Sequence, residues 1–268
     1  MRRLLALLAL LLLCLALPAT AQLRVVSLAP SLTETMLDLG ASDLLVGVLD
    51  GGERPASLAG LPSVGRYGQL QAERLLSVKP DLVLLWPDSV GAAGRDQLKK
   101  LSIPQLVVEP RDLEQLAQSF ITIGERIGRA EQGRQLAERF AAGLAQLRQR
   151  HAREVPLEVF YQVWDQPLYT LGGKQIVSDA LRVCGARNLF ADLTLPAPQV
   201  GIEAVLQRNP AVILVSEPAQ LGAWQAWPQL DAVKKRQVWA VPDRGLERPS
   251  FQMLQATEKL CRLLDTAH

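Results

Sequence analysis

Residues Ala130 to Arg153 read AEQGRQLAERFAAGLAQLRQRHAR, which predicts one long amphipathic helix. One face of this helix is apolar and carries Leu136, Phe140, Leu144 and Leu147. The remaining faces are polar. With a rise of ~1.5 Å per residue, such a helix is roughly 35 Å long and can bridge two lobes. Gly133 and Gly143 each weaken a helix by up to ~1 kcal/mol, so we expect packing of the apolar face to stabilise it. An ordinary surface helix of one large domain is the alternative interpretation.

Strand and helix patterns alternate on both sides of this helix, as is typical of parallel sheets covered by helices. The apolar or β-branched segments that predict strands are 23–28, 45–48, 82–86, 105–108, 157–163, 212–215 and 238–241. Helices are predicted between them, and the first begins at Ser31, which has capping-box spacing with Glu34. In open α/β sheets ligands bind where strands end, so the turns after these strands form the candidate site.

Two stretches on opposite sides of the long helix resemble one another without a gap. The first, QLQAERLLSVKP over 69–80, aligns with QVGIEAVLQRNP over 199–210, and each continues into an apolar strand. Such repetition indicates a duplicated architecture. We therefore predict an α/β fold of two Rossmann-like lobes with central parallel sheets, joined by one long rigid helix. The predicted lobes span 22–128 and 155–268, and the connecting backbone helix spans 129–154.

Glu73 and Glu203 occupy matching positions in the two repeats, each in the first turn of its helix. An acidic residue there interacts favourably with the helix dipole, which is worth ~0.5 kcal/mol and requires no further role. Alternatively, two lobes related by approximate two-fold symmetry would present both carboxylates on one surface, where arginines of partner subunits could bind them. The residues alone leave both interpretations open.

The beginning of the chain, residues 1–21, predicts a secretory signal peptide. Two arginines precede an apolar run from Leu4 to Leu17, and Ala19-Thr20-Ala21 has the small-x-small pattern of a cleavage site. The run is shorter than the ~20 residues of a membrane span. Cleavage removes two of the 29 basic residues and none of the 27 acidic ones, so the exported chain is formally neutral. Neutrality argues against nucleic acid as a partner.

The sequence contains too few cysteines and histidines for a metal site, but its cysteines suit one disulfide. Cys14 leaves with the signal peptide, so Cys184 and Cys261 remain as an even pair in an exported protein, and we expect a disulfide between them. The two histidines are His151, on the long helix, and His268, at the end of the chain, so we predict no metal site.

Several of these motifs resemble those of a known family. The segment from Ser27 to Glu34, the run from Glu73 to Trp86, and Ala197-Pro-Gln-Val with Glu203 are similar to periplasmic cobalamin-binding proteins of ABC importers. Those proteins belong to the class of substrate-binding proteins whose lobes are joined by a helical backbone. The resemblance covers nearly all of the mature chain. It implies a periplasmic protein that captures cobalamin or a related corrinoid.

The resemblance implies a cleft between the lobes that holds a large, flat, partly apolar ring. Aromatic side chains supply contact area in such a site, and a few polar groups orient the ligand. The family pattern departs at Ala197, where a tryptophan is expected beside Pro-Gln. From the residues alone, Trp86 could instead cap a core, and Arg248 could pair with Asp243 or Glu247. The ligand-binding residues that the resemblance implies are Tyr67, Trp86, Trp164, Tyr169, Asp243 and Arg248.

The same resemblance implies how the protein meets its transporter. Glu73 and Glu203 would bind arginine pockets of the two permease subunits, and the long helix would be a rigid hinge that permits only small lobe closure. The family pattern also matches Cys184 and Cys261 to a disulfide. Cobalamin would be the transported ligand rather than a cofactor, and we expect a monomer that is not an enzyme.

Two other functions are candidates. Within the class, a haem carrier would take its iron ligand from Tyr67, Tyr161 or Tyr169, and a ferric-siderophore carrier would use arginines such as Arg66, Arg244 and Arg248. Outside the class, an exported two-domain α/β enzyme is the alternative. The sequence contains no Gly-x-Ser-x-Gly elbow, Walker loop or His-Glu-x-x-His motif that would support it.

Overall fold

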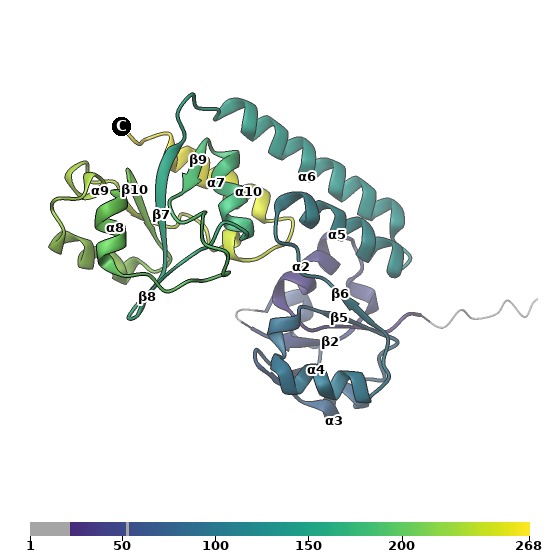
Figure 1. Cartoon of the computed structure of the whole chain (residues 1–268). Coiled ribbons are helices and arrows are strands. Elements are labelled where there is room, and N and C mark those ends of the chain that lie inside the picture. Colours follow the sequence, from purple (N-terminus) through teal and green to yellow (C-terminus); the bar gives the residue numbers. More distant parts are fainter. Residues whose placement is uncertain (1–21, 52–53) are drawn as a thin grey trace, which may run out of the picture.

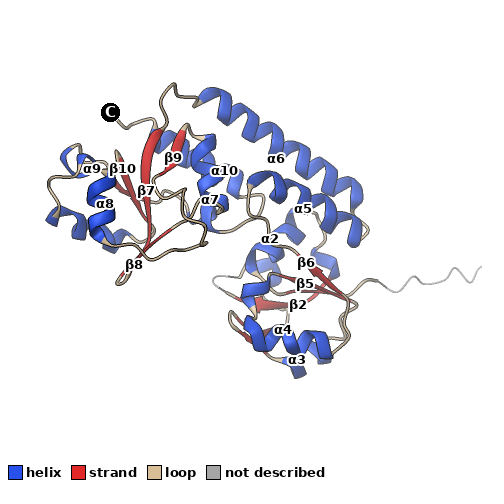
Figure 2. Ribbon diagram, viewed as in Figure 1, coloured by secondary structure: helices blue, strands red, loops and turns tan. Residues whose placement is uncertain are grey.

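The computed structural model describes residues 22–51 and 54–268 and shows two lobes connected by one long helix (Figure 1). Each lobe has its own sheet with helices packed around it, and the two sheets are separate (Figure 2). The predicted two-lobe α/β fold is therefore confirmed. The predicted signal peptide, residues 1–21, lies outside the described residues. Among the helices of the described segments, none combines the length and the apolar character needed to cross a membrane.

The N-terminal lobe contains a six-stranded sheet in the order β4-β3-β2-β1-β5-β6. Its neighbouring strands are parallel except for β3 and β4, which pair antiparallel. The strands are β1 (Val25–Ser27), β2 (Leu45–Asp50), β3 (Ser63–Arg66), β4 (Gln69–Leu70), β5 (Leu82–Leu85) and β6 (Gln105–Val107). The helices are α2 (Pro30–Asp38), α3 (Ala72–Ser77), α4 (Gly91–Lys100) and α5 (Leu113–Arg126), with short 3₁₀ helices at Ser42–Leu44, Ala56–Leu58 and Pro87–Ser89.

The C-terminal lobe contains a five-stranded sheet in the order β11-β10-β7-β8, with β9 paired to β7. Again one pair, β7 and β8, is antiparallel and the others are parallel. The strands are β7 (Leu157–Asp165), β8 (Leu168–Thr170), β9 (Ala186–Asn188), β10 (Val212–Val215) and β11 (Val238–Ala240). The helices are α7 (Ile176–Val183), α8 (Ile202–Arg208), α9 (Asp231–Lys234) and α10 (Met253–Leu264), with 3₁₀ helices η4 (Pro218–Ala226) and η5 (Arg244–Glu247).

The long helix α6 (Ala130–Arg150) packs along α5 and also contacts α7 and α10 of the C-terminal lobe. All four residues of its predicted apolar face are buried, as expected. Gly133 has a role that the sequence did not show, because a Cβ there would lie 2.6 Å from the carbonyl oxygen of Phe120. Glycine thus allows the backbones of α5 and α6 to approach closely where they cross.

One apolar core runs through both lobes. The residues of β1 and β5 that face α2 and α5 belong to the same cluster as the residues of β7 and β10 that face α7 and α10. Within this cluster Phe120 and Phe140 form an edge-to-face pair with ring centroids 5.5 Å apart, and Phe251 packs 6.0 Å from Phe140. The opposite faces of the two sheets have separate cores. Packing of the shared core therefore helps α6 to fix the position of the lobes.

The two duplicated stretches fold alike. Glu73 and Glu203 are each the second residue of a short helix, α3 and α8 respectively. Each helix is followed by a residue in the left-handed region, Lys79 with φ 43° and Asn209 with φ 45°, and then by proline. The next strand, β5 or β10, is fully buried in both lobes. The repeat seen in the sequence is therefore a repeat of structure.

The structure corrects two local predictions. No capping box forms at α2, because Ala29 is the N-cap residue and Pro30, whose fixed φ suits the first helical position, begins the helix. Ser31 lies inside the helix, and the Glu34 side chain reaches the other lobe instead of the helix start. Strands β3 and β4, which are not among the predicted strands, form a hairpin, and the φ of Gly68, 81°, permits its turn.

Candidate functional site

A cavity of about 560 Å³ lies between the two lobes, and side chains of both lobes line it. From the N-terminal lobe, Tyr67 follows β3, Trp86 and Asp88 follow β5, and residues 109–111 follow β6. These positions after the carboxyl ends of the strands are where open α/β sheets bind ligands. The wall from the C-terminal lobe consists of Tyr161, Val163, Leu171, Lys174, Gln175, Ile176, Val177, Thr194, Pro196, Leu246, Glu247 and Pro249.

A second hollow, which we call the annex, has a volume of about 290 Å³ and adjoins the cavity. Both spaces are lined by Tyr67, Trp86, Glu247 and Pro249, so these residues mark the junction. The remaining wall of the annex comes from residues 29–31 after β1, from Gly51 after β2 and from Arg248. The two spaces together extend the cleft along the strand ends of the N-terminal lobe.

The two tyrosines of the cavity differ in their surroundings. Tyr67 is 60% exposed, and partial burial together with the charge of Asp88 raises the pKa of its hydroxyl. Tyr161 is fully buried and donates a hydrogen bond of 2.9 Å to Oε1 of Glu247, which also accepts one from Ser216. Burial and the carboxylate of Glu247 hold the pKa of Tyr161 well above its ordinary value. Both phenols are therefore neutral at physiological pH.

The charged side chains at the cavity are mixed in sign. Asp88, Glu109 and Glu247 contribute carboxylates, and Arg111 and Lys174 contribute cations. Arg111 lies 3.4 Å from Glu109, which partly offsets both charges. Among the residues that the structure describes, no group of His, Cys, Asp or Glu is arranged to hold a metal ion. The lining can thus supply both donors and acceptors without a strong net charge.

The predicted residues of the N-terminal lobe, Tyr67 and Trp86, lie together at the junction of cavity and annex. Arg248 lines the annex, but its Nη1 donates to Oε1 of Glu34 at 3.0 Å rather than to Asp243 or Glu247.

The structure places the other three predicted ligand contacts of the C-terminal lobe away from the cavity lining. Trp164 and Tyr169 stand opposite one another on the β7–β8 hairpin, and Val163 and Leu171 line the cavity instead. Asp243 accepts hydrogen bonds from the Gly245 N–H and from Lys259 Nζ. Burial acts to raise the pKa of Asp243, but these two donors outweigh it and hold the pKa below its ordinary value. Asp243 therefore stabilises the loop before α10 through these two hydrogen bonds.

Sequence reasoning did not assign Asp88, Glu109, Lys174 or Glu247 to the cleft. A signal was present for the first two, because Asp88 and Glu109 lie within two residues of the ends of predicted strands in the N-terminal lobe. No local pattern marks Lys174 or Glu247. Their place at the cavity depends on how the loops of the C-terminal lobe pack against Tyr161 and α7.

The paired glutamates are exposed at the starts of α3 and α8. Each of these helices lies on the side of its lobe away from α6 (Figure 1). Neither glutamate lines the cavity or the annex. Both carboxylates are therefore exposed and lie outside the lining of the cleft.

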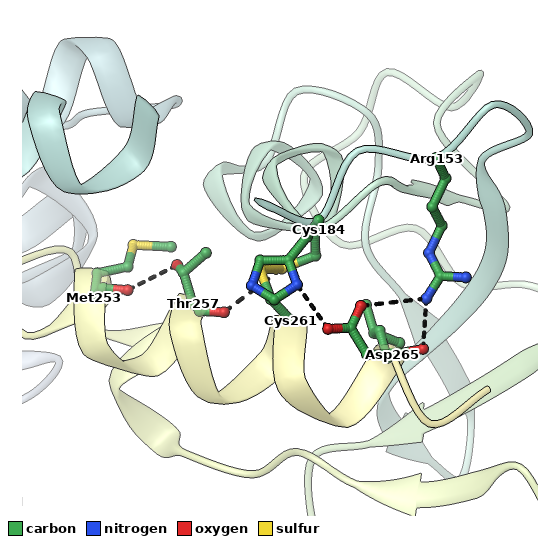
Figure 3. The surroundings of a disulfide bond; sticks show 8 residues. Arg153, Cys184, Met253, Thr257, Cys261 and Asp265 are labelled. Carbon is green, nitrogen blue, oxygen red and sulfur yellow. Dashed lines mark hydrogen bonds and ion pairs between the residues drawn. A yellow bond between two sulfur atoms is a disulfide. The ribbon is translucent and has the colours of Figure 1, made fainter. Parts of the chain in front are cut away.

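Cys184, at the end of α7, forms a disulfide with Cys261 of α10 (Figure 3). Both cysteines are fully buried, and their Cα atoms are 4.6 Å apart, so the predicted pairing is confirmed. Next to it, Nδ1 of His151 lies 2.7 Å from Oδ2 of Asp265. Arg153 donates to the Leu264 carbonyl at 2.8 Å. His151 is therefore part of the packing around the disulfide and not of the ligand cleft.

Comparison with known proteins agrees with this geometry. A family model described as periplasmic binding protein matches residues 25–244. The vitamin B12-binding protein of Yersinia pestis is 36% identical over 251 residues, which are 92% of this chain and 88% of that protein. The crystal structure of the periplasmic vitamin B12 binding protein of Vibrio cholerae has a TM-score of 0.81 and 33% identity, over 90% of this chain and 96% of that one. The periplasmic heme binding protein of the same organism has a TM-score of 0.79 over 91% of this chain and 99% of that one, but 23% identity, which shows the fold alone.

Proposed function

The chain belongs to the periplasmic binding protein family, and from this premise we propose that it captures cobalamin or a related corrinoid between its lobes and delivers it to the permease of an ABC transporter. The observation that carries this proposal is the aromatic pair Tyr67 and Trp86 at the junction of the cavity and the annex. Flat, partly apolar rings gain contact area from such side chains at little cost in conformational entropy. The vitamin B12-binding relatives support the choice of ligand.

The rest of the lining suits a ring fringed with amides. Val163, Leu171 and Leu246 supply apolar surface, while carboxylates and cations of the cavity can accept from and donate to neutral amide groups. Amides need hydrogen-bond partners of both kinds but no net charge. The mixed signs of the lining therefore favour a neutral polar ligand over a polyanion.

Haem fits this site less well. A tyrosine binds ferric iron as a phenolate, and burial together with Asp88 makes the phenolate of Tyr67 harder to form. Tyr161 is buried and bonded to Glu247, and His151 is bonded to Asp265.

A ferric siderophore is also less well supported. Each of the three arginines predicted for such a carrier already has a partner within the protein. Arg66 donates to Gln69, Arg244 pairs with Glu217, and Arg248 pairs with Glu34. Of the three, Arg248 alone lines the cleft.

Outside the cleft, we propose that Glu73 and Glu203 dock to arginines of the two permease subunits. Their equivalent positions at the starts of α3 and α8 support this role, since a repeated lobe presents the same charge twice. We further propose that the protein acts as a monomeric carrier in the periplasm, after removal of residues 1–21, and not as an enzyme. The named relatives are binding proteins, which supports this reading.

The test is calorimetric titration of the purified mature chain with cyanocobalamin, cobinamide and haemin. We expect saturable binding of cyanocobalamin, and the loaded protein should stay red after desalting. Trp86→Ala should weaken binding at least tenfold. Trp164→Ala is the matched control, because that side chain is exposed on the β7–β8 hairpin outside the cavity. Retention of haemin together with failure to retain cyanocobalamin would overturn the proposal.

A further inference from the structure

Among the described residues, the side-chain donors to the carboxylate of Glu34 all belong to the opposite lobe. Glu34 lies on α2 of the N-terminal lobe, and its Oε1 accepts a hydrogen bond of 3.0 Å from Nη1 of Arg248. Its Oε2 accepts one of 2.9 Å from the Ser250 hydroxyl and another from Nε2 of Gln252. Three donors within five residues of the C-terminal lobe thus converge on one side chain that lies more than 200 residues away in sequence. We call this set of contacts the Glu34 latch.

The segment that carries these donors is attached to the C-terminal lobe as well. At its beginning, Asp243 binds Lys259 of α10. In its middle, Glu247 accepts from Tyr161 and Ser216. At its end, by contrast, Phe251 packs against Phe120 of α5 in the N-terminal lobe and against Phe140 of α6. The beginning and middle of the segment are therefore held by the C-terminal lobe, and its end contacts the N-terminal lobe and α6.

The same segment forms part of the ligand cleft. Leu246, Glu247 and Pro249 line the cavity, and Arg248 lines the annex. One helical turn before Glu34, Pro30 and Ser31 form the facing wall of the annex. Any change in the separation of α2 and this segment consequently changes the width of the cleft.

We propose that Glu34 is a positioning residue, whose latch holds residues 246–252 against α2 and so fixes the gap in which the ligand binds. The Glu34 side chain is 20% exposed, so its bonds lie largely shielded from water, and the bond to a guanidinium is charge-assisted. Without the carboxylate, Arg248 and the buried Ser250 lose their shared acceptor. The lobes are then held by the shared core, α6 and the remaining polar contacts between them, such as the hydrogen bond of 2.9 Å from the Leu113 N–H to Asp179. The effect on ligand binding rests on the proposed function, whereas the effect on lobe separation does not.

The experiment measures lobe separation and ligand release in the same variants. Spin labels at Lys99→Cys on α4 and Gln207→Cys on α8 report the distance between lobes by pulsed electron resonance, because both side chains are exposed. The mature chain otherwise holds its two cysteines in the disulfide. Release of cyanocobalamin is followed by stopped-flow absorbance. Glu131→Gln is the matched control, since it removes an exposed carboxylate that pairs within α6.

We expect Glu34→Ala to broaden the distance distribution toward larger values and to speed cyanocobalamin release at least tenfold, with little change in the association rate. Glu34→Gln should lie between it and the parent, and Glu131→Gln should match the parent. Should Glu34→Ala not fold, Gln252→Ala removes one donor and should show the same changes more weakly.

Unchanged distances in Glu34→Ala would overturn the latch. A broadened distribution with unchanged release from a chain that binds would overturn its role in positioning the ligand. If the parent binds no cyanocobalamin but the distances still broaden, the proposed ligand is wrong and the latch stands.

Discussion

Replacing Gly133 by alanine should destabilise the protein, although alanine is the better helix former. Propensity alone favours alanine over glycine by ~1 kcal/mol in a helix interior. A Cβ at position 133 would, however, lie 2.6 Å from the carbonyl oxygen of Phe120 and 3.2 Å from the Cα of Ile121. Both neighbours are backbone atoms of α5, so neither can rotate away and the two helices must separate. Overpacking of this kind costs ~1–3 kcal/mol, and we take its upper part here. The expected net loss is about 1–2 kcal/mol.

Gly143→Ala on the same helix is the matched control. A Cβ at position 143 would lie 2.6 Å from Cδ2 of Leu254, which is the far end of a flexible side chain. Because Leu254 is only partly buried and can change rotamer, we expect this variant to be as stable as the parent or up to ~1 kcal/mol more stable.

Urea denaturation followed by tryptophan fluorescence gives the free energies of unfolding, and calorimetry gives Tm. For a protein of this size the loss in Gly133→Ala corresponds to roughly 2–8 °C. Equal stability of the two variants, or a gain in Gly133→Ala, would refute the close crossing of α5 and α6 as the reason for glycine at position 133.

Three further predictions concern docking, the disulfide and pH. The double variant Glu73→Ala and Glu203→Ala should abolish cobalamin uptake by cells while calorimetry shows unchanged ligand affinity, and a loss of affinity would instead place these carboxylates in the cleft. Replacing Cys184 and Cys261 by alanine should lower the free energy of unfolding by about 4 kcal/mol, because the unfolded chain regains the entropy of a 77-residue loop; an unchanged urea midpoint would contradict this. Burial and a neighbouring carboxylate of α2 raise the pKa of Asp38 to about 6 in the folded protein. The charged form of Asp38 therefore opposes folding above that pH, and this cost in free energy disappears as the pH falls toward 4. Asp38→Asn should therefore raise the free energy of unfolding by about 1 kcal/mol at pH 8, a value reduced to allow for the exposure of this side chain, and should leave it unchanged at pH 4. Equal gains in stability at both pH values would contradict this account.

The family resemblance implied Tyr67 and Trp86, and the ends of the strands explain why both line the cleft. Tyr67 and Trp86 come directly after β3 and β5, and parallel strands bring their carboxyl ends to one edge of the sheet. In the C-terminal lobe, Trp164 and Tyr169, which the resemblance also implied, are not among the residues that line the cavity. Their position depends on the antiparallel pairing of β7 with β8, which extends the hairpin past the residues that line the cavity. Neither strand alone carries a signal for that pairing.

The sequence by itself determined the two lobes, the long helix between them, the repeated starts of α3 and α8, and the disulfide pair. These features rest on periodicity, turn residues and cysteine count, which are properties of short segments or of composition. Only the tertiary structure decided that Glu34 serves the opposite lobe instead of its own helix start, and that Gly133 is needed for close packing. The partners of Glu34 lie more than 200 residues away, and those of Gly133 lie on another helix. Such contacts exist only after the chain has brought distant segments together.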